Sequence, residues 1–256
     1  MRLTDSRSRR LTPVRRGPGG LLRVCVHPAP AGRHDLLGDL RAMLVADVLF
    51  RIAELEDLQV ITGHVERSLP EERTRALTGA AGRLGIHPPA VRTPDAAVSA
   101  PFGGPVDVHV LAPSAAPPPT EDGLLVAVGP AQPPGGTDTP AADGADPSAL
   151  RLALLALPYA LPARITEAAL AEAGATLARW RGRVAAWADA PSRPMHADTV
   201  RRLGAAYDDD LDTPAVLEAL RRLEDDPDVP DGAKFETFVY ADRVLSLELP
   251  SEIGRV

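Results

Sequence analysis

Cys25 and His27 are the first side chains along the chain that could take part in chemistry, and both stand at the end of the apolar run 21–26. A thiolate can coordinate zinc, and a histidine changes its charge near neutral pH. Cys25 is the only cysteine among 256 residues, which excludes an intrachain disulfide and a multi-cysteine zinc site and fits a reducing compartment. Two interpretations of His27 stay open: it faces a ligand crevice, or it is a hydrogen-bonded structural group.

The elements around these residues predict a βαβ unit. The run 21–26 is typical of a buried strand, 36–55 has apolar residues at helical spacing with Asp35 as its expected N-cap, and 58–62 is the next strand. Two strands joined through a helix pair in parallel with a right-handed crossover. Ligands bind at the carboxyl ends of such strands, so we expect a crevice beside the segments that follow Val26 and Ile61.

The pattern then continues with a helix over 70–84 and strands over 106–111 and 123–128. Residues 112–147 hold nine prolines and five glycines, so apart from the strand 123–128 we expect a mobile linker there. We divide the chain into an α/β domain over 1–111, completed by the strand 123–128, and an α-helical bundle over 148–256. The helices expected in the bundle begin at an Asp146 N-cap, after Thr166, at 196, at a Thr213 cap and at 232.

Charge excludes some classes of partner. The net charge of −7 argues against broad nucleic-acid binding. Seven arginines lie in 1–23 and ten acids in 208–231, and we interpret both runs as solvated segments. The longest uncharged apolar run, 152–163, is too short for a membrane span, and no signal peptide is visible. We expect a cytoplasmic protein that does not bind membranes.

Several stretches, in this order, resemble the cysteinyl-tRNA synthetases, a family of class I aminoacyl-tRNA synthetases. The resemblance implies a Rossmann-like parallel-sheet domain followed by a helical bundle that contacts the tRNA stem. It also implies binding of ATP, a zinc ion that selects cysteine, and a charged mobile loop. The matching stretches are Gly38-Asp39-Leu40-Arg41 with Asp47-Val48-Leu49, Val60-Ile61-Thr62, Leu84 to Pro89, DPSALRLALL at 146–155 and DDDLDTPAVLEAL at 208–220.

The catalytic motifs of that family are altered here. Its HIGH motif, whose histidines hold ATP phosphates, matches Leu36-Leu37-Gly38-Asp39, which keeps only the glycine. Its KMSKS lysines fall on 131–135, which contains no cation. Each missing cation should cost the adenylation transition state several kcal/mol of stabilisation, about as much as the loss of one oxyanion-hole donor costs other enzymes.

The zinc site implied by the family is also incomplete. Cys25 keeps the first ligand position and His109 offers at most one more, whereas zinc needs about four ligands. We therefore interpret Cys25 as a vestigial ligand position occupied by a small buried hydrophobic residue. We expect no zinc and no catalytic residues. The degenerate nucleotide or substrate site should comprise His27, Gly38, Asp39 and Thr62.

Three functions follow from this comparison. The first is a paralogue without aminoacylation activity that binds a small ligand or a protein partner. The second is a working ATP-dependent cysteine ligase, acting on tRNA or on a small amine as the mycothiol-type ligase does. The third is a structural interaction module, in which arginines along 179–202 and acids along 208–231 would suit a homodimer or a complex with an active synthetase. ATP stays open as a ligand, and tRNA binding is not expected because the acceptor-contacting insert has no counterpart.

Overall fold

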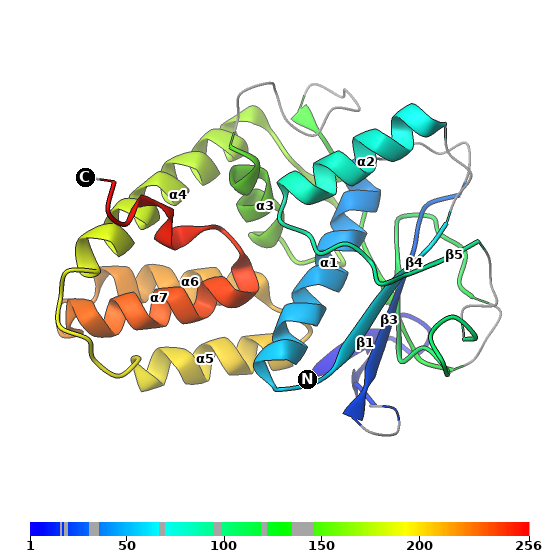
Figure 1. Cartoon of the computed structure of the whole chain (residues 1–256), viewed down its shortest axis with the longest axis horizontal. Helices are drawn as coiled ribbons and strands as arrows, with labels where there is room; N and C mark the ends of the chain where they lie inside the picture. The colour runs from blue at the N-terminus through cyan, green and yellow to red at the C-terminus, as the bar shows by residue number, and fades with distance from the viewer. Residues whose placement is uncertain are drawn as a thin grey trace.

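A five-stranded parallel sheet forms one side of the molecule (Figure 1). The computed structural model describes residues 1–15, 17, 20–30, 36–66, 70–94, 99–118, 122–134 and 146–255, so the expected Asp35 cap lies outside the described residues. The strand order β5-β4-β3-β6-β7 is that of a Rossmann-like α/β fold, as predicted. The strands are β3 (Leu22–His27), β4 (Val60–Val65), β5 (Val91–Thr93), β6 (Val108–Leu111) and β7 (Leu124–Ala127).

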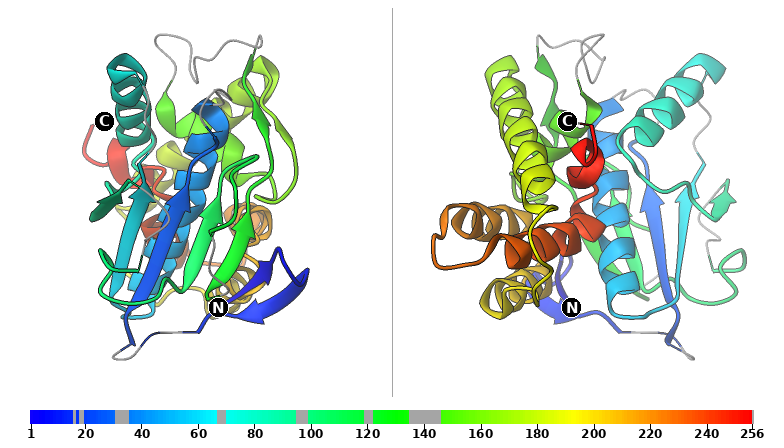
Figure 2. Two further views of the ribbon diagram at one scale, coloured as in Figure 1. Left: turned by 90° about the vertical axis from the view of Figure 1, so that its right-hand side faces the viewer. Right: turned by 60° about the vertical axis from the view of Figure 1, so that its left-hand side comes forward.

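Helix α1 (Leu36–Leu55) lies between the sheet and the helical half (Figure 2). It follows β3 and leads into β4, which pairs with β3 in parallel, so the predicted βαβ unit is confirmed. Nearly every residue from Leu37 to Leu49 is buried, because the sheet covers one side of α1 and α7 packs on another. Helix α2 (Glu71–Arg83) follows β4 and contacts α1 near the carboxyl ends of the strands.

The second half is helical, as predicted. Asp146 and Thr166 cap their helices with side chains that accept from Ser148 N and Ala169 N. The predicted Thr213 cap is wrong by one residue: the Asp212 carboxylate accepts from Ala215 N, while the Thr213 hydroxyl donates to Leu155 O at 2.7 Å. No described helix is both long and apolar enough to cross a membrane. The helices are α3 (Pro147–Leu155), α4 (Glu167–Trp187), α5 (Ala197–Asp208), α6 (Thr213–Asp225), α7 (Asp231–Leu245) and the short η3 (Leu249–Glu252).

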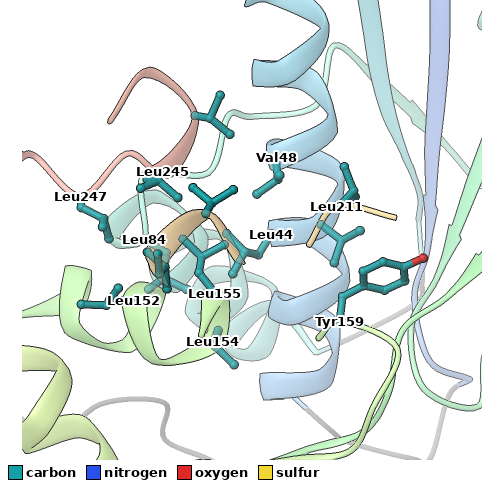
Figure 3. Packing of buried hydrophobic residues seen from close by; sticks show 14 of the residues in the cluster. Leu44, Val48, Leu84, Leu152, Leu154, Leu155, Tyr159, Leu211, Leu245 and Leu247 are labelled. Carbon is teal, nitrogen blue, oxygen red and sulfur yellow. The ribbon is translucent and has the colours of Figure 1, made fainter. Parts of the chain in front are cut away.

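One hydrophobic core runs through both halves. Figure 3 shows Leu44 and Val48 of α1 close to leucines of α3 and to Leu245, at the end of α7. A core shared in this way removes apolar surface of each half from water. The boundaries drawn from the sequence between the α/β domain and the bundle stay a prediction.

The segment after β7 is not the irregular linker that its prolines suggested. Ala131–Gln132 forms β8, which pairs in parallel with β9 (Ala163–Arg164). The buried guanidinium of Arg41 donates to the carbonyls of Gly129, Pro130, Pro158 and Leu161 at 2.6 to 3.4 Å. The short strand β8 forms in a proline-rich segment because Arg41 of α1 holds the two residues that precede it. The described part, 122–134, is therefore built into the fold, and 135–145 lies outside the described residues.

The start of the basic run meets the start of the acidic run, although most of the described arginines and acids in these runs are exposed, as expected. Residues 1–13 form a hairpin, β1 (Arg2–Asp5) and β2 (Arg10–Pro13), beside β7 (Figure 2). The amino terminus of Met1 lies 2.8 Å from the Asp208 carboxylate. Asp210 accepts from the backbone N–H and the hydroxyl of Thr4 at 2.7 and 2.8 Å. The acids at 208–210 thus anchor the hairpin to the helical half.

A buried ion pair joins four helices at the centre of the molecule. Asp47 of α1 and Arg151 of α3 have fully buried side chains 2.7 Å apart. Arg151 also donates to the carbonyls of Leu84, after α2, and Leu245, at the end of α7. Asp47 accepts further from Arg51 and from the ring and backbone N–H of His87. Every polar atom that burial removes from water finds a partner here, which a buried charge requires.

Removing one partner of this pair should destabilise the fold strongly. We expect Arg151→Met to lower the free energy of unfolding by about 3–5 kcal/mol, because it leaves a buried carboxylate short of a partner. Urea denaturation measures the change. The exposed Arg222 supplies the control, Arg222→Met, with an expected change within about 0.5 kcal/mol. Adding Asp47→Leu to Arg151→Met should recover part of the loss, and a purely additive double variant would contradict the pairing.

The same pair predicts a pH dependence. Burial alone would raise the pKa of Asp47, but the hydrogen bond from His87 and the charges of Arg151 and Arg51 outweigh it and lower that pKa. A carboxyl with a lowered pKa stabilises the fold above its ordinary pKa of about 3.9, and the contribution is lost as pH falls below that value. The free energy of unfolding should therefore fall more steeply between pH 5 and pH 3 in the wild type than in Asp47→Asn. If the free energy of unfolding fell equally steeply in both proteins, the lowered pKa of Asp47 would be contradicted.

Candidate functional site

A cavity of about 510 Å³ lies at the carboxyl ends of β3, β4 and β5. Its floor includes a row of side chains from the three strands: Val26 is the register partner of His64, and His64 is the register partner of Arg92. Register partners point to the same face of a sheet, so the parallel pairing brings these three together. Volumes of about 300–1,000 Å³ are typical of small-molecule sites.

The walls of the cavity are mostly apolar. Helix α1 supplies Asp39 and Met43, and α2 supplies Leu77 and Ala81 among others. The turn from α2 to β5 closes one side with a hydrophobic and proline-rich stretch. The residues of that turn which line the cavity are Ile86, His87, Pro88 and Pro89.

His64 and Arg92 are the polar pair on the cavity floor. Burial, and after it the charge of Arg92, lowers the pKa of His64 to about 4, so the ring is neutral at pH 7. The Arg92 side chain is exposed to the cavity and forms no ion pair with any described residue. The floor therefore presents one guanidinium and one neutral imidazole side by side.

Of the four expected site residues, the structure places only Asp39 in the cavity wall. Asp39 is 3% exposed, and its carboxylate accepts from Ala29 N at 2.9 Å, which holds the segment after β3. Gly38 is buried in the first turn of α1. Thr62 lies inside β4, two residues before His64, and its carbonyl accepts from Ala90 N. Neither Gly38 nor Thr62 lines the cavity.

His27 lies outside the cavity, paired with another histidine. Its Nε2 is 2.9 Å from Nδ1 of His109 on the neighbouring strand β6, and the two rings lie in contact. Burial lowers the pKa of both rings to about 4. This placement is the one expected for a structural histidine, because its ring is buried and hydrogen-bonded. Its role in ligand binding stays a prediction.

Cys25 and His109 do not fit a zinc ion. Cys25 is fully buried, packs against Phe102 and Val106, and has its pKa raised to about 12 by burial. Zinc binds the thiolate, which this environment disfavours. The Nδ1 of His109 is engaged by His27. Across the described ranges, no three His, Cys, Asp or Glu side chains come together as a metal site.

The positions that we expected to match the family's lysine loop lie in and after the strand β8. Ala131 is buried and Gln132 pairs with Arg164 in the β8–β9 sheet. Pro133 and Pro134 follow, and Gly135 lies outside the described residues. Arg41, which holds this segment from α1, has its guanidinium occupied by carbonyl oxygens.

The sequence reasoning missed His64, Arg92 and His87. It placed the crevice after Ile61 and stopped at Thr62, although a strand that continues with period two carries His64 onto the same face as Thr62. Arg92 lies in β5, a three-residue strand that no pattern indicated. The available signal was a histidine two residues beyond the expected strand end.

Part of the chain is similar to curated enzymes. The L-cysteine:1D-myo-inositol 2-amino-2-deoxy-alpha-D-glucopyranoside ligase of Gordonia bronchialis is 47% identical over 78 residues, which cover 30% of this chain and 18% of that protein. The ligase of the same name from Streptomyces griseus is 46% identical over 80 residues, 31% of this chain and 19% of that protein. The one from Rhodococcus jostii is 38% identical over 111 residues, 42% of this chain and 26% of that protein.

About a third of this chain is homologous to cysteine ligases. The matches span only about a fifth to a quarter of the length of those relatives. No protein-family model matches the chain. Together with the parallel sheet and the helical half, the similarity supports a cysteine-ligase-like protein with a class I synthetase-like fold. It leaves the altered motifs and the activity as proposals.

The burial of Cys25 predicts that its thiol reacts slowly. With its pKa raised to about 12, the thiol should react with a chromogenic disulfide at pH 8 about a hundredfold more slowly in the folded protein than in concentrated urea. Stopped-flow absorbance measurements give the reaction rates of the folded and of the unfolded protein. Zinc at equimolar concentration should leave the folded rate unchanged. Protection by zinc would show that the thiolate is a ligand after all.

Proposed function

We propose that this chain is a cysteine-ligase-like protein that binds a small ligand and does not form an aminoacyl adenylate. One observation supports the proposal. The positions that we expect to match the family's phosphate-binding side chains hold Leu36, Asp39 and the segment 131–134, none of which is cationic. The similarity to cysteine ligases supports the ligase-like fold in this proposal, and the cavity supports the binding of a small ligand.

Electrostatics argue against a bound triphosphate. The carboxyl groups of Asp39 and Glu66 both line the cavity. Among the described residues that line the cavity, Arg92 supplies the guanidinium that faces these two acids. Adenylation needs donors and cations aimed at the charge that develops on the phosphates, and each such group contributes several kcal/mol, about 2.7–4 for one well-placed donor. Adenylation at a site without these groups should be slower by orders of magnitude.

The β8–β9 pairing supports the same conclusion. A loop that closes over a substrate must move, but Gly129 lies so close to the turn at 160–161 that an added Cβ would fall 2.3 Å from Leu161 O. With Arg41 bonded to the same turn, this segment is fixed on both sides. Its backbone is therefore used for packing.

A working ATP-dependent cysteine ligase is the second candidate. The observation that favours it is the similarity of 30% to 42% of this chain to enzymes of that class. In that case another part of the protein would have to supply the missing cations, because the described cavity lining offers Arg92 and no lysine.

Pyrophosphate exchange separates the two candidates. With ATP, cysteine and zinc, we expect this protein to exchange labelled pyrophosphate at least about a thousandfold more slowly than an active cysteinyl-tRNA synthetase in the same assay, since it lacks several transition-state contacts. Exchange within about tenfold of that enzyme would favour the ligase. Calorimetric titration with ATP is the companion measurement, and we expect no binding heat.

A further inference from the structure

The row His64–Arg92 on the cavity floor has the chemistry of an anion site. Both side chains project from one face of adjacent parallel strands, because they are register partners. Arg92 offers a planar fork of N–H donors, which suits a carboxylate in a bidentate arrangement. His64, neutral at pH 7, offers one N–H donor, and no described hydrogen bond occupies its ring. His87, on the rim, has only its Nδ1 engaged, by Asp47.

The rest of the cavity is suited to an uncharged apolar body. Met43, Leu77, Ala81 and Ile86 face the space from α1, α2 and the turn after α2. Burying a hydrocarbon group against such side chains contributes about 25 cal/mol per Å² of surface removed from water. A cavity of about 510 Å³ has room for a ring or a branched chain.

We infer that the cavity binds a monocarboxylate with an apolar body, whose carboxylate lies between the Arg92 guanidinium and the His64 ring. This assignment rests on the proposed ligand-binding function and names the class of its ligand. A single negative charge matches the one guanidinium that the described lining offers. A phosphate ester would bring a second charge toward Asp39 and Glu66, both of which line the same space.

Asp39 shapes this selectivity without competing for Arg92. Its carboxylate is engaged by Ala29 N and comes from α1, whereas Arg92 comes from β5. Its charge therefore stays fixed in the wall. The combination favours one carboxylate and disfavours a polyanion, which is the behaviour expected of a site that has lost its phosphate-binding role.

Calorimetry on the full chain tests the ligand class with two pairs of probes: benzoate with benzamide, and 4-methylpentanoate with 4-methylpentanamide. The members of a pair have nearly the same shape and differ in charge. We expect the carboxylates to bind at least about tenfold more tightly than the amides, which is a typical effect of one charged hydrogen bond. Binding of an amide as tightly as its carboxylate would overturn the inference.

Variants locate the site. Arg92→Gln should weaken benzoate binding at least about tenfold, and His64→Phe should weaken it by a smaller factor. Arg75→Gln is the matched control, because Arg75 is an exposed arginine on α2 that does not line the cavity, and we expect it to bind benzoate as the wild type does. Benzoate should also raise the pKa of His64 in a histidine NMR titration, since a nearby anion favours the protonated ring. An unchanged affinity in Arg92→Gln would overturn the assignment.

The outcomes separate this inference from the proposed function. Amides that bind as well as carboxylates would refute the carboxylate class and leave a ligand-binding cavity without adenylation. Rapid pyrophosphate exchange would refute the proposed function, whatever the probes show. Binding of none of the four probes would overturn the inference, because the described lining should accept at least one of the two carboxylates.

Discussion

The ion pair between Asp47 and Arg151 is the constraint on which the arrangement of the two halves depends. Both side chains are fully buried, so neither charge can turn to water if the other moves. Arg151 fixes the ends of α2 and α7 through backbone carbonyls, and Asp47 fixes His87 at the cavity rim. The position of the rim is therefore tied to the packing of the helical half. A ligand cavity at strand ends normally depends on loops, but this one has a rim held by the core.

Long elements with regular patterns were predictable from the sequence, and short ones were not. Helix α1 was expected over 36–55 and is found there, because its apolar residues recur along twenty positions. The hairpin β1–β2, strand β5 and the β8–β9 pair were missed. Each has two to four residues per strand, too few for a periodic pattern, and the partners of β5 and β8 are distant in sequence, such as Ala163 for Ala131. The shift of the cap from Thr213 to Asp212 has a similar cause, since the hydroxyl of Thr213 is drawn to Leu155 O.

The position of the candidate site was predictable from long, regular elements, whereas most of its side chains were not. A crevice near the carboxyl ends of the first two parallel strands was expected from the βαβ pattern, and the cavity touches Val26 and the segment after Ile61. Which side chains form the floor depends on register between strands, which no local pattern records. The pairing of Val26 with His64 and of His64 with Arg92 is a property of the sheet. His27 and Cys25 were conspicuous in the sequence because of their residue types, yet both lie in packed surroundings.

The way in which Arg41 binds the segment after β7 bears on any attempt to engineer a ligase from this scaffold. Lysines grafted onto 131–134 would supply charge, but Arg41 holds the two residues before this stretch, and its first two residues pair with β9. A cation there could not follow a departing pyrophosphate. A segment that closed over a substrate would first have to lose the guanidinium contacts of Arg41, at a cost in folding stability.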